Sequence, residues 1–127
     1  MEVKIDTKEK FHVITLLQPE LSATMTEEFS DRLLSFLQSD TKNIVLNLKE
    51  LRYIDNTSAE NIVKVQQKFY ENNASLLVCE LQPKIEEFLD SHQLLEMMNI
   101  TPTESEAWDI IQMEEIEREL LDGSAEP

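Results

Sequence analysis

Short apolar runs alternate with amphipathic stretches along this chain, and this alternation constrains the fold more than any other feature. Residues 43–48 and 76–79 are almost continuously apolar, which is typical of strands covered on both faces. Stretches that begin near residues 24, 57 and 83 carry apolar side chains at spacings of three and four, which predicts helices. Strands that alternate with helices need crossover connections, so the pattern predicts a largely parallel sheet.

The first 17 residues predict an antiparallel hairpin at one edge of that sheet. Residues 3–7 alternate in polarity, residues 11–17 are rich in large apolar and β-branched side chains, and residues 8–10 are short enough for a hairpin link. Three helix starts carry a capping box, in which a threonine and a glutamate three residues later satisfy free backbone amides. The three pairs are Thr24 with Glu27, Thr57 with Glu60, and Thr103 with Glu106.

The 127 residues fit one domain. We expect an α/β fold with a single-layer, mostly parallel sheet of four or five strands, the N-terminal antiparallel hairpin and about four helices. The stretch 94–100 fits either the end of a helix or a short edge strand. The domain is predicted to span residues 1–121, with a last helix over about 104–121, and residues 122–127 are expected to form a flexible tail.

Composition excludes several classes of function. Gly123 is the only glycine, so no glycine-rich phosphate-binding loop can form. The net charge of −15 gives no basic face for nucleic acid or an anionic membrane, and it favours a partner with a basic surface. The N-terminus has no apolar signal core, and the longest apolar run is four residues. We therefore expect a soluble, cytoplasmic protein that does not bind membranes directly.

Residues that could carry catalysis or bind a metal are few. Cys79 is the only cysteine, and His12 and His92 lie far apart without ligand-like spacing. We expect no metal, no cofactor and no catalytic residue. An enzyme that uses paired carboxylates with a histidine is the weaker hypothesis, because the carboxylates fall mainly on exposed helix faces rather than in a pocket.

The richest polar cluster lies where a strand leads into a helix. Asp55, Asn56, Thr57 and Ser58 are consecutive, and Glu60 and Asn61 follow within the first turns of the helix. A phosphate on Thr57 or Ser58 would lie at the positive end of the helix dipole, and Asp55 could bind a partner or the Mg²⁺ of a kinase–nucleotide complex. The same residues are also ordinary capping and turn formers, which need no further function.

Residues 43–58 resemble the central signature of STAS domains, the family of anti-sigma factor antagonists. The match lies in the pair Asn47-Leu48 and in the run Tyr53-Ile54-Asp55, and the order of elements is similar over residues 3–112. The resemblance implies a domain that binds partner proteins without catalysis. In bacterial circuits the partner is an anti-sigma factor with serine kinase activity, which phosphorylates the first hydroxyl after the aspartate.

Here Asn56 occupies the position of that phosphoacceptor, and Ser58 occupies the position of the family's glycine. The phospho-switch is therefore either lost or moved to Thr57 or Ser58. We expect a protein-interaction domain of a bacterial regulatory circuit whose binding residues are Asp55, Asn56, Thr57, Ser58, Glu60 and Asn61. The alternative is a structural STAS subunit of a larger assembly, such as a lipid-transport complex or a stress-signalling scaffold.

The last helix carries more apolar residues than docking on a sheet needs. From residue 101 onward the chain has nine acids and one base, Arg118. Ile116, Leu120 and Leu121 either pack on their own domain, as amphipathic helices usually do, or form a homodimer or partner surface with acidic flanks.

Overall fold

The computed structural model describes residues 2–125 of the chain, and its elements follow one another in a strand–helix order. The elements are β1 (Val3–Thr7), β2 (Phe11–Leu16), β3 (Glu20–Leu21), α1 (Ala23–Ser35), the 3₁₀ turn η1 (Phe36–Gln38), β4 (Asn43–Asn47), β5 (Tyr53–Ile54), α2 (Asn56–Glu71), β6 (Leu76–Cys79), α3 (Pro83–Ser91), the 3₁₀ turn η2 (Leu95–Met97), β7 (Ile100–Thr101) and α4 (Glu104–Ala125).

The main sheet has five strands in the order β1-β2-β4-β6-β7. The β1–β2 hairpin is antiparallel, with Val3 opposite Leu16, and every other pair in this sheet is parallel. This arrangement confirms the predicted fold class. A second, two-stranded parallel sheet joins β3 to β5, and its β3 strand was not predicted.

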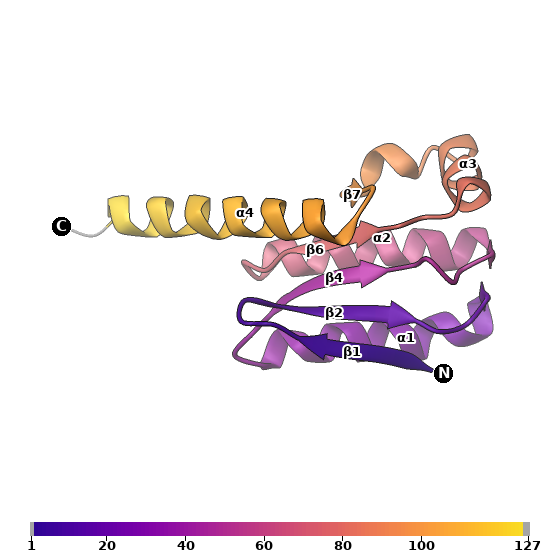
Figure 1. The fold of residues 1–127 in the computed structure, drawn as a ribbon, viewed down its shortest axis with the longest axis horizontal. Coiled ribbons are helices and arrows are strands. Elements are labelled where there is room, and N and C mark those ends of the chain that lie inside the picture. The colour runs from indigo at the N-terminus through magenta and orange to yellow at the C-terminus, as the bar shows by residue number, and fades with distance from the viewer. Residues whose placement is uncertain (1, 126–127) are drawn as a thin grey trace.

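The two faces of the main sheet are covered differently (Figure 1). One face packs against α1, α2 and α3, and its centre holds the fully buried rings of Phe29 and Phe69. The other face packs against the first half of α4 through Ala107 and Ile111. Because β4 and β6 are buried on both faces, β6 is apolar throughout and β4 is apolar at every position between its terminal asparagines.

Two of the three predicted capping boxes are wrong. α1 begins at Ala23 after the N-cap Ser22, so it starts two residues earlier than a cap at Thr24 would require. α2 begins at Asn56, because Asp55 rather than Thr57 caps it. Thr103 does cap α4 as predicted: its hydroxyl oxygen accepts a hydrogen bond from the amide of Glu106 at 3.3 Å.

The ambiguous stretch 94–100 contains both predicted elements, since η2 is followed directly by the start of the edge strand β7. α4 continues as helix to Ala125, so the predicted boundary at 121 is four residues too early. The expected flexible tail over 122–127 is thus helical in its first four residues, and residues 126–127 lie outside the described part of the chain.

Polar contacts attach α4 to the sheet beyond its apolar half. Asn47 on β4 donates to Glu104 at 2.7 Å, and Asn43 at the other end of β4 donates to Glu115 at 2.7 Å. The Ser75 hydroxyl donates to Glu114 at 2.6 Å. These contacts hold about three turns of the helix, from Glu104 to Glu115, in one orientation on the sheet.

Candidate functional site

Asp55 lies between the ends of two helices that are distant in the sequence. It is the N-cap of α2, and its Oδ1 accepts a hydrogen bond from the amide of Ser58 at 2.8 Å. Its Oδ2 accepts one from the amide of Ala23, the first residue of α1, at 2.8 Å. One carboxylate therefore closes the N-termini of α1 and α2, which begin at the same end of the sheet (Figure 1).

The electrostatics of Asp55 follow from these contacts. Its pKa is lowered from the ordinary carboxyl value, first by the nearby Ser58 hydroxyl and then by the amides of Ser58 and Ala23, with burial acting in the opposite direction. The hydroxyl makes no hydrogen bond of standard geometry, so the two amide bonds are the firmer cause. Asp55 is thus an ionised carboxylate whose two oxygens each accept a backbone hydrogen bond, rather than a free ligand for Mg²⁺.

The first turn of α2 presents three side chains to solvent: Asn56, Thr57 and Glu60. The Asn56 amide donates to the Glu60 carboxylate at 2.6 Å, so the two side chains form a single polar group on the helix surface. Thr57 is the exposed hydroxyl beside them.

Ser58 differs from its neighbours because it is fully buried. Its hydroxyl is shielded from a kinase in this fold, which argues against the prediction of Ser58 as a phosphoacceptor. Asn61 is also engaged inside the domain. Its amide donates to the hydroxyls of Ser30 and Thr26, both on α1, so it ties α2 to α1 rather than facing a partner.

The structure adds residues to this site that local sequence patterns did not reveal. The start of α1, at Ala23 and Thr24, is exposed next to the start of α2. Tyr53 on β5 lies two residues before Asp55 and is 56% exposed. Tyrosine is a residue type that commonly contributes much of the binding energy of an interface. An exposed aromatic next to a capping aspartate was a usable signal, whereas nothing local marks the contact between residues 23 and 55.

No catalytic arrangement forms around the histidines in the described residues. His12 is buried between the Thr7 hydroxyl and the backbone oxygen of Thr41, and His92 ends α3 with its Nδ1 at 2.9 Å from the backbone oxygen of Phe88. Within residues 2–125, no cluster of three or more His, Cys, Asp or Glu side chains could hold a metal ion.

Over the same residues, no helix combines the length and apolarity that crossing a membrane would require.

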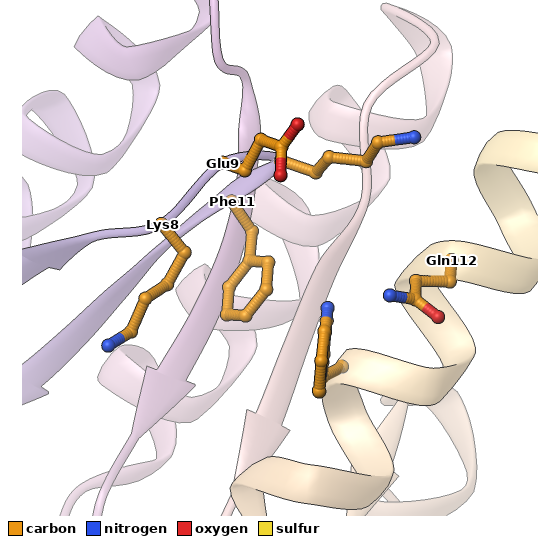
Figure 2. A pocket seen from close by; sticks show the side chains of 6 residues that line it. Lys8, Glu9, Phe11 and Gln112 are labelled. Atoms are coloured by element: carbon orange, nitrogen blue, oxygen red, sulfur yellow. The ribbon is translucent and has the colours of Figure 1, made fainter.

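A cavity of about 340 Å³ lies at the other end of the sheet, away from Asp55. Figure 2 shows Lys8 and Glu9 of the β1–β2 turn on one side of it and Gln112 of α4 on the other. Its floor is formed by Phe11 and Trp108, whose ring centroids are 6.3 Å apart. This cavity shares no residue with the candidate site at the start of α2.

Comparisons with known proteins agree with this fold. A STAS domain protein from Planctomyces limnophilus, described as an anti-sigma factor antagonist, superposes with a TM-score of 0.73 at 17% identity, over 87% of this chain and 97% of that one. The Bacillus cell fate determinant SpoIIAA in its phosphorylated form gives 0.62 at 17% identity, over 87% and 99%.

The same fold also occurs inside a much longer protein. The murine Solute Carrier 26 family member A9 anion transporter gives a TM-score of 0.72 at 12% identity, over 85% of this chain but 18% of the transporter. The family description "STAS domain" matches residues 2–107, which is most of the sequence. The chain therefore belongs to the STAS domain family, and its fold resembles that of anti-sigma factor antagonists.

Proposed function

We propose that this chain is a non-catalytic, cytoplasmic protein-interaction domain of a bacterial regulatory circuit that acts on transcription. Its partner would be an anti-sigma factor with serine kinase activity, bound at the paired N-termini of α1 and α2. The observation that carries the proposal is the double hydrogen bonding of Asp55, which fixes the two helix starts side by side. Rigid, exposed polar groups on a preformed surface bind partners with a low ordering cost.

We further propose that the domain binds its partner constitutively. Asn56 carries no hydroxyl, and its amide is neutral, so it neither accepts phosphate nor imitates the charge of about −1.5 to −2 that phosphate adds. Thr57 is the one exposed hydroxyl between residues 55 and 60, and a phosphate there would lie beside the Glu60 carboxylate. Like charges three residues apart on a helix repel each other, which opposes phosphorylation of Thr57. This favours loss of the phospho-switch over its transfer to Thr57.

The test is affinity capture from a lysate of the native host, followed by mass spectrometry of the partners and of the peptide over residues 56–60. We expect an anti-sigma kinase without phosphate on Thr57. Glu60→Lys is expected to lose the kinase, whereas Lys84→Glu, a charge reversal at an exposed site on α3, is the matched control. Recovery of the same kinase by Glu60→Lys would refute the binding site.

A gain-of-function variant tests the lost switch separately. Asn56→Ser restores a hydroxyl at the position next to Asp55, and we expect the captured kinase to phosphorylate it and then to release the domain. Phosphate on Thr57 of the unmodified protein would instead show that the switch has moved by one residue.

A second candidate function is a structural STAS subunit of a larger assembly. The observation that favours it is the apolar outer side of α4, where Ile116 and Leu120 are exposed. Deleting residues 114–127 would also remove the contacts of Glu114 and Glu115 with the sheet, so point substitution is the cleaner test. If Ile116→Ser no longer captures partner proteins that Glu60→Lys still captures, this function would be favoured.

A further inference from the structure

The outward side of α4 carries an apolar stripe that its own domain does not cover. Met113, Ile116 and Leu120 are 60%, 55% and 67% exposed, and their spacings of three and four place them along one side of the helix. The residues that dock on the sheet, Ala107 and Ile111, lie on the opposite side. Of the two alternatives for Ile116 and Leu120, packing on their own domain is therefore not what the structure shows.

Contacts on the inner side of α4 keep this stripe turned outward. Glu114 accepts hydrogen bonds from the Ser75 hydroxyl and from Tyr70, the latter at 2.9 Å. Arg118 donates to Ser75 at 2.5 Å and forms an ion pair with Glu115 at 3.4 Å. Rotating the helix to bury Ile116 would break all of these contacts, so the stripe is a fixed surface of the folded protein.

The helix continues past the end of the sheet, so a partner could approach the stripe from the side (Figure 1). It also continues past residue 107, where the family match ends. The stripe thus lies outside the residues that the family match covers. Its projecting end lies at the opposite end of the sheet from the Asp55 site (Figure 1).

The charges beside this apolar stripe indicate what kind of partner helix can bind to it. Residues 104–121 contain seven acids and one base, and Asp109, Glu117 and Glu119 are exposed beside the stripe. Two copies of α4 laid against each other would bring these acids together, which is unfavourable across an apolar interface. A helix with basic flanks would find opposite charges on both sides of its apolar contacts.

The cavity of Figure 2 lies beside Trp108 and Gln112, at the end of the α4 stripe that is closer to the start of the helix. Trp108, Gln112, Ile116 and Leu120 follow one another at intervals of four, so they form one row on α4. Trp108 is 46% exposed, and together with Phe11 it makes a concave apolar floor where the row begins. Such a hollow suits one bulky apolar side chain of a helix lying along the row.

We propose that the outer face of α4, defined as Trp108, Met113, Ile116 and Leu120, binds a basic amphipathic helix of a partner protein. The partner helix lays its apolar side along the row, inserts one bulky side chain above Phe11 and Trp108, and places its lysines or arginines over Glu117 and Glu119. This interaction goes beyond the anti-sigma partner proposed at the Asp55 site, because it uses a separate surface at the other end of the sheet, and it specifies the partner chemistry for the face of α4 on which the second candidate function rests.

The test uses a synthetic 14-residue helical peptide of leucine and lysine with leucines on one side, and a scrambled peptide of the same composition. Trp108 is the single tryptophan of the chain, so its fluorescence reports directly on the proposed surface. We expect a saturable blue shift with the amphipathic peptide and none with the scrambled one. In 0.5 M NaCl the affinity is expected to fall several-fold, because screening weakens the charge contacts.

Variants separate the apolar and the charged parts of this contact. Ile116→Ser combined with Leu120→Ser is expected to weaken binding by about tenfold or more, since each loses apolar contact area. Met97→Ser is the matched control, because Met97 is 55% exposed on η2 and lies outside the surface. Glu117→Gln combined with Glu119→Gln is expected to weaken binding several-fold, and circular dichroism verifies that each variant is folded.

Three results would overturn the proposal. One is equal binding by the scrambled peptide, and another is undiminished binding by the double serine variant. The third is a concentration-dependent dimer in analytical ultracentrifugation that the double serine variant abolishes, which would assign the face to a second copy of this chain. Glu60→Lys is expected to leave peptide binding unchanged, so failure here and failure at the Asp55 site are distinguishable.

Discussion

At the scale of single residues, the most consequential side chain is Asp55, because it supports both the fold and the candidate site. Asp55→Ala removes the hydrogen bonds to Ser58 and Ala23, so α2 loses its N-cap and α1 loses the acceptor of its first backbone amide. A lost N-cap costs about 0.5–2 kcal/mol, so we expect a loss of roughly 2–3 kcal/mol in the free energy of unfolding, measured by urea denaturation. Asn56→Ala, which loses only the contact with Glu60, is the control and is expected to change stability by about 0.5 kcal/mol or less.

The pH dependence of that difference checks the cause. The pKa of Asp55 is lowered in the folded protein from the ordinary 3.8, so the unfolded state takes up a proton first as the pH falls. The stabilisation is therefore present above about pH 4 and is lost progressively below it. The gap in unfolding free energy between the unmodified protein and Asp55→Ala is expected to narrow between pH 6 and pH 3. A gap that widens would contradict the assignment.

Cys79 offers a second prediction at this scale. Burial raises the pKa of its thiol to about 12, and the carboxylates of Glu80 and Glu104 add to the effect. Since the thiolate is the reactive form, native protein is expected to resist iodoacetamide at pH 8, whereas protein in urea reacts completely. Mass spectrometry of the intact chain measures the labelled fraction, and rapid labelling without urea would show that Cys79 is accessible.

Residue roles were predictable from sequence only where they depend on neighbours along the chain. Asp55, Asn56, Thr57 and Glu60 lie together because they form the N-cap and the first turns of one helix, which the sequence places next to one another. The second hydrogen bond of Asp55 joins residues 32 positions apart, and no local pattern contains that information. For the same reason the burial of Ser58 in the first turn of α2 could not be predicted from its polar side chain.

At the scale of elements, the attachment of α4 depends on a phenol that stays protonated. Burial and the neighbouring Glu114 raise the pKa of Tyr70 to about 12, and the neutral hydroxyl donates to that carboxylate. A raised pKa stabilises the folded state below pH 10, and this stabilisation is lost as the pH rises from 10 towards 12. We expect the stability advantage of the unmodified protein over Tyr70→Phe to shrink between pH 9 and pH 11, as measured by urea denaturation.

Tyr53→Phe is the matched control for this prediction, because Tyr53 is exposed on β5 and makes no contact with Glu114 in the described structure. The difference between the unmodified protein and Tyr53→Phe is expected to stay constant over the same pH range. An unchanging advantage over Tyr70→Phe would mean that the Tyr70–Glu114 contact does not stabilise the folded state.

The elements themselves were largely predictable, because periodicity over eight or more residues marks each main helix. The exceptions have physical reasons. β3 has two residues, too few to show any alternation, and it exists because residues 20–21 pair with residues 53–54. The start of α1 was misplaced because Thr24 and Glu27 imitate a capping box, although Ser22 is the N-cap.

At the scale of the whole molecule, the excess of acids sets the response to salt. The net charge is −15, and the described residues form two ion pairs, Lys4 with Asp6 and Arg118 with Glu115. Repulsion among the remaining acids therefore opposes the compact state more than pairing supports it. Raising NaCl from 20 mM to 500 mM shortens the Debye length from about 20 Å to about 4 Å and suppresses this repulsion. We expect the midpoint of thermal unfolding to rise by about 3–6 °C, which corresponds to about 1 kcal/mol for a domain of this size.

Calorimetry at both salt concentrations measures this shift, and a variant isolates its source. Replacing Asp109, Glu117 and Glu119 together with the corresponding amides removes three exposed acids from α4 without touching its contacts to Ser75 or Asn43. That variant is expected to start from a higher midpoint at 20 mM NaCl and to gain less from added salt. A midpoint that falls with salt would show that attractive pairs dominate, and it would also remove the charge argument against self-association through α4. The salt response of the isolated domain thus bears on which partner its outer helix can accept.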